Sequence, residues 1–366
     1  FQDIDLEAAF EAVAEFSATV HLTSDHGLLM TQAIKTAILK RGVGHLVFPD
    51  NVQPKPAAED AEAYGPAGRM ADLSVSPPPS AVDEAMALLK GAKRPMIIVG
   101  YGALSGMDRV IALAEQLGAP VATTFKAKGQ IGDDHALAVG VMGRSGTPIA
   151  SWFMNEADLL LVFGSSFSDH TGIYEGAPTI QVDTDPMRLA KRHPVTVPVM
   201  GDVGVTADLF NSALASGGSA AMDLRSEVAE RCSLWRSEKA SRQAEDRGKG
   251  VSAAALFEAL TKHAPEDAIL PVDVGNNTYS FGRYLETKGT QRVLMSGYLG
   301  SIGFGFPAGM GAWAATGLRP VLSDHRRLSG RQPRRRLRIS PEQTPVRARE
   351  PRHGAVRSVA TDRAAG

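Results

Sequence analysis

Between residues 80 and 215 the chain alternates between amphipathic helical patterns and short apolar runs. Such short runs, bounded by glycine, proline or polar residues, are typical of buried strands. Strands connected by helices build parallel sheets that are covered on both faces. The sequence therefore predicts the α/β class, with parallel sheets covered by helices. Helices are expected at residues 80–91, 107–117 and 203–214, and strands at residues 95–99, 120–125, 158–163, 179–182 and 196–199.

A shorter segment with mixed helix and strand patterns precedes this domain. It contains an amphipathic stretch at residues 6–18, helical spacing at residues 28–40 and a predicted strand at residues 45–49. We therefore interpret residues 1–52 as the last part of an α/β domain. Residues 53–79 are rich in Pro, Ala and Gly, which predicts an inter-domain linker.

A third, short segment follows the central domain. Residues 216–250 predict a flexible joint and then a charged surface helix. Residues 251–322 contain a predicted helix, a strand at residues 268–272 and a glycine-rich helix at residues 303–315. This stretch is shorter than an α/β domain of the usual size. We interpret it as the N-terminal part of such a domain.

The formal net charge of −1 conceals a basic C-terminal end. Residues 323–366 hold twelve arginines and four acidic residues, a charge of +8, and we expect this tail to be disordered. A basic tail could bind nucleic acid through its phosphates. This one contains no lysine, no aromatic residue and no recognisable binding motif, so nucleic-acid binding is the least favoured interpretation.

The cysteine content and the hydropathy restrict the chemistry and the compartment. Cys232 is the single cysteine, which excludes an internal disulfide and a multi-cysteine metal site. No run of about 18 apolar residues could span a bilayer. We therefore expect a cytoplasmic protein without membrane interaction, and the sequence assigns no metal ligand.

Three glycine-containing segments could approach a ligand closely. Gly100 and Gly102 follow the predicted strand at residues 95–99 and fit either a nucleotide-binding turn or a tight turn between strand and helix. Residues 273–278 also follow a strand and fit either a diphosphate cradle or an Asx-type turn with a helix cap. Residues 297–312 alternate glycines with apolar residues, so we expect their backbone to lie against a ligand or a packed helix.

In this order and spacing, the segments resemble the thiamine diphosphate-dependent family that includes acetolactate synthase, pyruvate oxidase and related 2-oxo acid decarboxylases. The resemblance implies a central Rossmann-like domain at residues 80–215, flanked by two incomplete thiamine diphosphate-binding-type domains. Residues 1–52 would be the C-terminal part of the pyrimidine-binding domain, and residues 251–322 the N-terminal part of the diphosphate-binding domain. The matching segments are residues 1–2 with the final helix and strand of the first domain (residues 28–40 and 45–49), 99–102, 123–125, 143–147, 158–164, 181–185 and 300–312.

The resemblance also implies cofactor contacts. The Gly300 carbonyl would accept a hydrogen bond from the aminopyrimidine of thiamine diphosphate, and Ile302 would hold the cofactor bent. The bend brings the amino group to the thiazolium carbon, where proximity favours a local proton transfer. The diphosphate would contact four consecutive residues, Val274, Gly275, Asn276 and Asn277.

Synthases of the family also bind a flavin through the central domain. The positions that match their flavin-binding residues would allow FAD or another nucleotide to bind here. Ser166, however, stands where those synthases have an arginine, so one positive partner for the flavin diphosphate is lost. The matching positions are Gly100, Gly102, Gly146 and Asp183.

Three features depart from the family pattern. The proton-relay glutamate lies upstream of the part matched by Phe1, so no catalytic residue is assigned. The magnesium and diphosphate motif should follow Leu322, but neither its Gly-Asp-Gly start nor its Asn-Asn end is present. Because a magnesium site usually needs a carboxylate there, we expect weakened binding of thiamine diphosphate and magnesium. The arginine-rich tail stands in that place, and we interpret it as a reading-frame product. Codons for residues 324–327 followed by the first base of the Leu328 codon can give Ile-Thr-Gly-Asp when read one base later.

The favoured hypothesis is a truncated and impaired member of this family. Its complete form would decarboxylate a 2-oxo acid such as pyruvate and transfer or oxidise the carbon fragment, as acetolactate synthase does. The alternative is a catalytically silent assembly or nucleotide-binding partner of a full-length homologue. By resemblance, the expected partners are a small 2-oxo acid and further copies of the chain in a dimer or tetramer.

Overall fold

The structure is a computed structural model of the chain. It describes residues 4–56, 67–244, 248, 250–297, 299–317 and 320–322, and the backbone of residues 338–339. The chain divides into two compact units, Phe1–Leu73 and Ser74–Gly366. The family-like segment at residues 1–2 lies outside the described residues, as does the tail that was predicted to be disordered, apart from residues 338–339.

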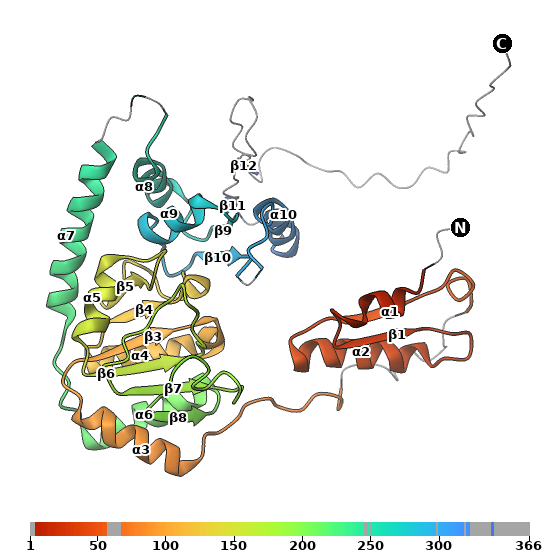
Figure 1. The fold of residues 1–366 in the computed structure, drawn as a ribbon, viewed down its shortest axis with the longest axis horizontal. Coiled ribbons are helices and arrows are strands. Elements are labelled where there is room, and N and C mark those ends of the chain that lie inside the picture. Colours follow the sequence, from red (N-terminus) through yellow and green to blue (C-terminus); the bar gives the residue numbers. More distant parts are fainter. Residues whose placement is uncertain are drawn as a thin grey trace. The chain divides into compact units, whose positions relative to one another are not determined.

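The N-terminal unit contains a parallel pair of strands and two helices (Figure 1). Residues 6–18 do not form one amphipathic element, because the helix ends at Glu11 and a strand begins at Phe16. The Glu15 N–H donates to the Val43 carbonyl at 2.8 Å, so the chain is already extended beside its partner strand there. The elements are α1 (Leu6–Glu11), β1 (Phe16–Thr19), α2 (His26–Lys40) and β2 (Gly44–Val47).

A six-stranded parallel sheet forms the centre of the second unit, in the order β5-β4-β3-β6-β7-β8 (Figure 1). The order reverses between β3 and β6, and open α/β sheets bind ligands outside the carboxyl ends of the strands at such a point. The strands are β3 (Pro95–Val99), β4 (Val121–Thr123), β5 (Ala138–Val141), β6 (Leu159–Phe163), β7 (Thr179–Asp183) and β8 (Val197–Met200). The helices are α3 (Pro79–Gly91), η2 (Tyr101–Gly106), α4 (Met107–Leu117), η3 (Phe125–Ala127), α5 (Pro148–Glu156), α6 (Val203–Gly217) and α7 (Arg225–Ala244).

Helices cover both faces of this sheet. Every residue of β3, β6 and β7 is buried, which explains why β3 and β6 are continuous apolar runs in the sequence. Alternate residues of β3 belong to two hydrophobic clusters, one shared with α3, α4 and α6 and the other with α5 and α7. The α/β class, with parallel sheets covered by helices, is therefore confirmed.

At the switch point, the backbone turns after β3 and β6 pack directly on each other. The Gly100 N–H donates to the Phe163 carbonyl at 2.8 Å, and the Gly102 N–H donates to the Gly164 carbonyl at 3.0 Å. A Cβ atom on Gly100 would lie 2.2 Å from the Gly164 oxygen. Gly100 is therefore required by the close approach of two backbone segments.

We expect Gly100→Ala to lower the free energy of unfolding by about 1–3 kcal/mol, because the extra methyl group overpacks a site walled by backbone. Gly91→Ala in α3 is the matched control, since no heavy atom lies within 4 Å of a Cβ placed there. Urea unfolding followed by circular dichroism measures both variants. Equal midpoints for the two variants would contradict the packing explanation.

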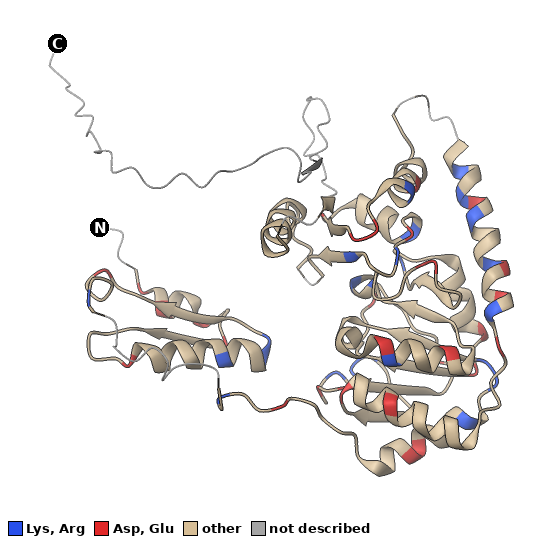
Figure 2. Ribbon diagram, turned by 180° about the vertical axis from the view of Figure 1, so that it is seen from behind, with Lys and Arg blue, Asp and Glu red and all other residues tan. Residues whose placement is uncertain are grey.

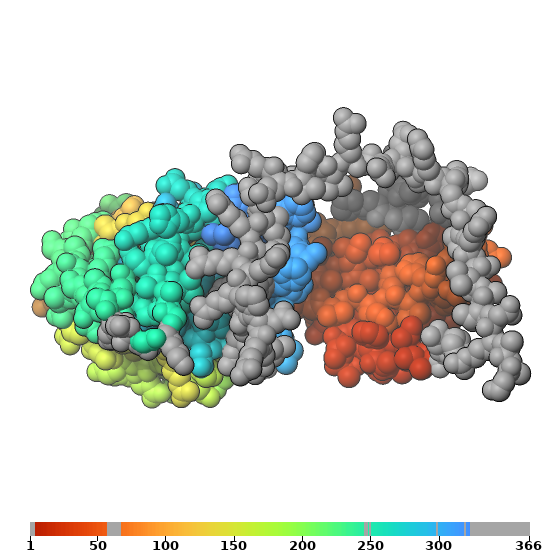
Figure 3. Space-filling model, turned by 90° about the horizontal axis from the view of Figure 1, so that it is seen from above, coloured from red at the N-terminus to blue at the C-terminus, as the bar shows by residue number. Residues whose placement is uncertain are grey.

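A second, smaller sheet with the order β10-β9-β11-β12 forms the C-terminal part of this unit. In Figure 3 its teal and blue surface is continuous with the yellow and green surface of the central domain. Residues 338–339, which fall within the predicted disordered tail, pair antiparallel with β11. The elements are α8 (Ala253–His263), β9 (Ile269–Val272), α9 (Asn276–Tyr284), β10 (Arg292–Met295), α10 (Gly305–Ala315), β11 (Val321–Leu322) and β12 (Arg338–Ile339).

Helix α7 joins the central domain to the C-terminal part. Figure 2 shows charged residues along its whole length, as the sequence predicts. However, Val228, Trp235 and Lys239 are buried, and the Trp235 ring stacks on Tyr284 of α9 with centroids 6.2 Å apart. Helix α7 therefore contributes buried side chains to the packing of the central domain against the C-terminal part. Among the described residues, no helix is both long and apolar enough to cross a membrane.

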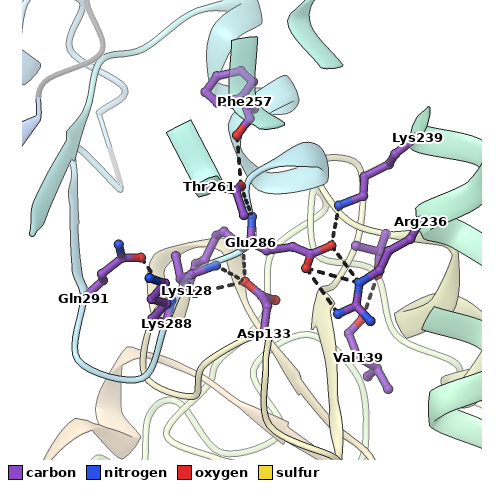
Figure 4. Close-up of polar contacts among 12 residues, drawn as sticks. Lys128, Asp133, Val139, Arg236, Lys239, Phe257, Thr261, Glu286, Lys288 and Gln291 are labelled. Carbon is purple, nitrogen blue, oxygen red and sulfur yellow. Dashed lines mark hydrogen bonds and ion pairs between the residues drawn. The ribbon is translucent and has the colours of Figure 1, made fainter. Parts of the chain in front are cut away.

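Two carboxylates with buried lysine partners reinforce this junction (Figure 4). Asp133 Oδ2 accepts from Lys128 Nζ at 2.9 Å and from the Thr287 N–H at 2.7 Å. Glu286 forms ion pairs with Arg236 at 3.2 Å and with Lys239. Lys128 and Asp133 both lie in the loop after β4, and the bond from Thr287 to Asp133 ties this loop to the loop after α9. The ion pairs of Glu286 tie the loop after α9 to α7. Together they fix the C-terminal part relative to the central sheet.

Candidate functional site

The first turn of the candidate site, residues 273–278, leads from β9 into α9. Thr278 Oγ1 accepts from the Gly275 N–H and donates to the Asp273 carbonyl, both at 2.9 Å. The Asn277 side-chain amide donates to the same carbonyl at 3.1 Å. Gly275 is the N-cap residue, with a φ of 156° that favours glycine. The helix therefore begins at Asn276, rather than being capped at Asn277 or Thr278 as the Asx-turn alternative expected.

Asp273 connects this turn to a second one. Its side chain is 2% exposed, and Oδ1 accepts from the Val274 N–H at 2.8 Å and from the Gly303 N–H at 2.7 Å. Hydrogen bonds to a carboxylate are stronger than those between neutral groups. Asp273 therefore holds together two turns that are 30 residues apart in the sequence.

The second turn, residues 299–303, follows β10 and precedes α10. Gly300 has a φ of +65°, a left-handed conformation that favours glycine, and a Cβ atom there would lie 3.6 Å from Val274 Cγ1. Ile302 is 57% exposed, and Leu299 is more exposed still. The structure thus brings the predicted diphosphate-contacting and pyrimidine-contacting residues together, and leaves the apolar side chain of Ile302 open to a ligand.

These residues fit a ligand with an anionic group and an apolar ring. The start of α9, where Asn276 is exposed, carries the N–H groups that a helix leaves without intrahelical partners, and such groups attract anions. Ile302 supplies an exposed apolar contact nearby in the second turn. The Val274 and Gly275 N–H groups already donate within the turn, so their contact with a diphosphate would not be through these donors.

The described residues include no group of three or more His, Cys, Asp or Glu side chains placed to hold a metal ion. The magnesium motif of the family is expected after Leu322, and residues 323–337 lie outside the described part of the chain. The expectation of weakened magnesium binding therefore stays a prediction.

The four predicted flavin or nucleotide residues lie at the carboxyl edge of the central sheet. Gly100 and Gly102 are explained by the close packing on Gly164 described above. A Cβ atom on Gly146 would lie 2.1 Å from the Val141 carbonyl oxygen, so this glycine is also required by backbone packing. Asp183 ends β7, is buried, and accepts from the Asp185 N–H at 3.0 Å. The geometry therefore explains the three glycines without a ligand.

Cys232 is not suited to be a nucleophile. It lines a cavity of about 30 Å³ beside Trp235, which is room for about one water molecule. Burial raises the pKa of the Cys232 thiol, so the reactive thiolate is disfavoured near neutral pH.

Two features of the site were not found from the sequence. Asp273 was seen only as the start of a turn motif, although an acidic residue directly after an apolar strand is a signal for a buried, hydrogen-bonded carboxylate. Lys126 was not singled out, and its Nζ atom lies 4.7 Å from the centroid of the Tyr101 ring. Both depend on contacts between segments that are distant in the chain.

Comparisons with known proteins agree with this geometry. Residues 82–210 match the family described as thiamine pyrophosphate enzyme, central domain. Residues 273–324 match the family described as thiamine pyrophosphate enzyme, C-terminal TPP binding domain. Both turns of the candidate site fall within the second match.

Three relatives illustrate the similarity. A putative thiamine pyrophosphate-containing protein, YdaP, of Bacillus subtilis is 29% identical, over 85% of this chain and 54% of its own length. A probable acetolactate synthase large subunit of Methanocaldococcus jannaschii is 28% identical, over 88% and 57%. Sulfoacetaldehyde acetyltransferase of Rhodobacter capsulatus is 31% identical, over 68% and 46%. The chain thus spans about half the length of the curated relatives it matches. With both domain matches in the family's order, it belongs to the thiamine diphosphate-dependent enzyme family.

Proposed function

We propose that this chain is part of a thiamine diphosphate-dependent enzyme that acts on a 2-oxo acid such as pyruvate, by decarboxylation followed by carbon–carbon bond formation or oxidation. The observation that carries the proposal is the pairing of the two turns, which places Gly300 beside Val274 and leaves Ile302 exposed. Thiamine diphosphate, when bound, supplies the electron sink that decarboxylation requires.

The residues of this chain would bind and orient the cofactor. Ile302 would support its apolar rings, and the Gly300 carbonyl would accept a hydrogen bond from its amino group. The start of α9 at Asn276 would receive the diphosphate. Asp273 would hold these groups in register, because it bonds to both turns.

The proposal also includes magnesium at reduced affinity and further copies of the chain. The resemblance implies that the cofactor lies between subunits, and the exposed apolar residues Leu299, Ile302 and Phe306 would then be covered by a second copy. Sedimentation velocity with and without thiamine diphosphate and magnesium measures this association. The flavin stays a prediction, tested by the visible absorbance spectrum of the purified protein.

Calorimetric titration of thiamine diphosphate in the presence of magnesium tests cofactor binding. We expect Ile302→Ser to weaken the affinity by about tenfold or more, because an apolar side chain of this size contributes about 1.5–3 kcal/mol when buried by a ligand. Unphosphorylated thiamine should bind far more weakly than the diphosphate. Because Ile302 is exposed, this substitution should leave the unfolding midpoint unchanged.

Val251→Ser is the matched control, since Val251 is also exposed but precedes α8 and belongs to neither turn. It should bind the cofactor as the unchanged protein does. A wild-type protein that binds no thiamine diphosphate would overturn the proposal. Equal affinities of the Ile302 and Val251 variants would remove Ile302 from the site.

A further inference from the structure

Lys126 and Tyr101 come from neighbouring strands of the central sheet. Tyr101 follows β3 and Lys126 lies in η3, just after β4, so both project from the carboxyl edge. Lys126 is exposed and its Nζ atom lies 4.7 Å from the Tyr101 ring centroid, while Tyr101 is 54% exposed. An ammonium group at this distance is attracted to the face of the ring. The aromatic ring therefore positions the charged end of Lys126.

The stem of Lys126 lies against the C-terminal part. A Cβ atom on Gly297 would be 2.7 Å from Lys126 Cδ, so glycine at this position leaves the space that the lysine stem occupies. Gly297 follows β10 and precedes the second turn of the candidate site by two residues. The Phe125 ring, next to Lys126, packs edge-on against Phe281 of α9 at 6.3 Å. Lys126 is thus held at the boundary where the central sheet meets the candidate site.

The charge of Lys126 has no counter-ion within the described part of the chain. Within the described residues, no carboxylate lies within ion-pair distance of Lys126 Nζ. The ammonium group instead contacts the Tyr101 ring, which carries no charge. Lys128, two residues later, is buried and paired with Asp133. The first lysine is therefore available to an external anion, whereas the second is part of the fold.

We propose that Lys126, seated on the Tyr101 ring and against Gly297, binds the carboxylate of a 2-oxo acid beside the exposed second turn. An ammonium group over the exposed Tyr101 ring matches a small molecule with one anionic end and a short apolar end. The choice of a 2-oxo acid rests on the proposed function, whereas the cationic site itself rests on the contacts of Lys126.

Pyruvate is the probe, and ligand-observed NMR line broadening on the full chain gives its dissociation constant. We expect Lys126→Met, which keeps the length of the stem and removes the charge, to weaken pyruvate binding by about tenfold or more. Lys126→Arg should restore most of the affinity. Methyl pyruvate, which has no carboxylate charge, should bind equally to wild type and Lys126→Met.

Lys93→Met is the matched control, because Lys93 is exposed and precedes β3, at the opposite end of the same sheet. It should bind pyruvate as wild type does. A Lys126→Met protein with wild-type pyruvate affinity overturns the site, and so does a wild-type chain that shows no saturable pyruvate binding with or without thiamine diphosphate. Circular dichroism of each variant checks that it is folded.

Thiamine diphosphate calorimetry on the same samples separates this inference from the proposed function. If thiamine diphosphate gives a heat of binding and Lys126→Met binds pyruvate as wild type does, the lysine site is rejected and the proposed function stands. Pyruvate binding that depends on Lys126 without any cofactor heat supports the anion site and rejects the proposed function. Loss of thiamine diphosphate affinity in Lys126→Met would show that the lysine binds the cofactor diphosphate instead, and would overturn its assignment to the substrate.

Discussion

Replacing Glu286 with glutamine is expected to lower the free energy of unfolding by about 3 kcal/mol, since removing one partner leaves a buried charge without compensation. Lys239 is 4% exposed and its ion-pair partner is Glu286, which also pairs with Arg236. Glu286 itself is 28% exposed, so the effect should lie at the low end of the range for buried pairs. Urea unfolding monitored by circular dichroism measures the change.

Asp185→Asn provides the matched control, because Asp185 forms an exposed pair with Arg188 within one turn of chain. Its effect should stay within about 0.5 kcal/mol. Replacing both Lys239 and Glu286 with methionine should recover much of the stability lost in Glu286→Gln, since an apolar pair needs no charge compensation. If Glu286→Gln unfolds at the same urea concentration as Asp185→Asn, the ion pair does not stabilise the junction.

The elements that the sequence predicted best are those with an unambiguous local signal. Strands β3 and β6 are continuous apolar runs because both faces of the central sheet are covered. Strand β5 was not predicted, because it is short and contains Gly140, whose φ of +84° interrupts the regular pattern. Strand β1 was merged into an amphipathic stretch, because its pairing with β2 depends on residues almost thirty positions later.

For the candidate site too, local signals could be read from the sequence, whereas contacts between distant segments could not. Gly275 and Gly300 lie in the two segments that the sequence analysis singled out for close approach to a ligand, and both have positive φ angles. The sequence could not show that a side chain ties their two turns together, since the bond from Gly303 to Asp273 crosses 30 residues. For Gly100 and Gly102 the sequence left a nucleotide-binding turn and a tight turn both open, and the structure shows that these two glycines and Gly146 lie against backbone; flavin or nucleotide binding there stays a prediction. A glycine pattern thus reports close approach, but not whether the neighbour is a ligand or the chain itself.

The second large effect is expected for Asp273→Ala, which should lower both the free energy of unfolding and the affinity for thiamine diphosphate. The substitution removes a carboxylate oxygen that accepts two backbone N–H groups in a buried site, and each such bond to a charged group contributes about 1.5–3 kcal/mol. We expect a loss of about 3 kcal/mol or more in the free energy of unfolding. Thiamine diphosphate affinity should also fall by about tenfold or more, because Val274 and Gly303 are no longer held together.

Asp273→Asn keeps the volume and one acceptor oxygen, and should therefore show a smaller loss, while remaining folded enough for titration. Hydrogen exchange of the Gly303 amide gives the local readout, since its protection depends on the bond to Asp273. Asp83→Ala, on the exposed side of α3, is the control and should change none of the three measurements. An unchanged exchange rate at Gly303 in Asp273→Asn, together with wild-type cofactor affinity, would mean that the two turns keep their positions without the carboxylate. In that case the pairing of Gly300 with Val274 would have to arise from the packing of β9 against β10 alone.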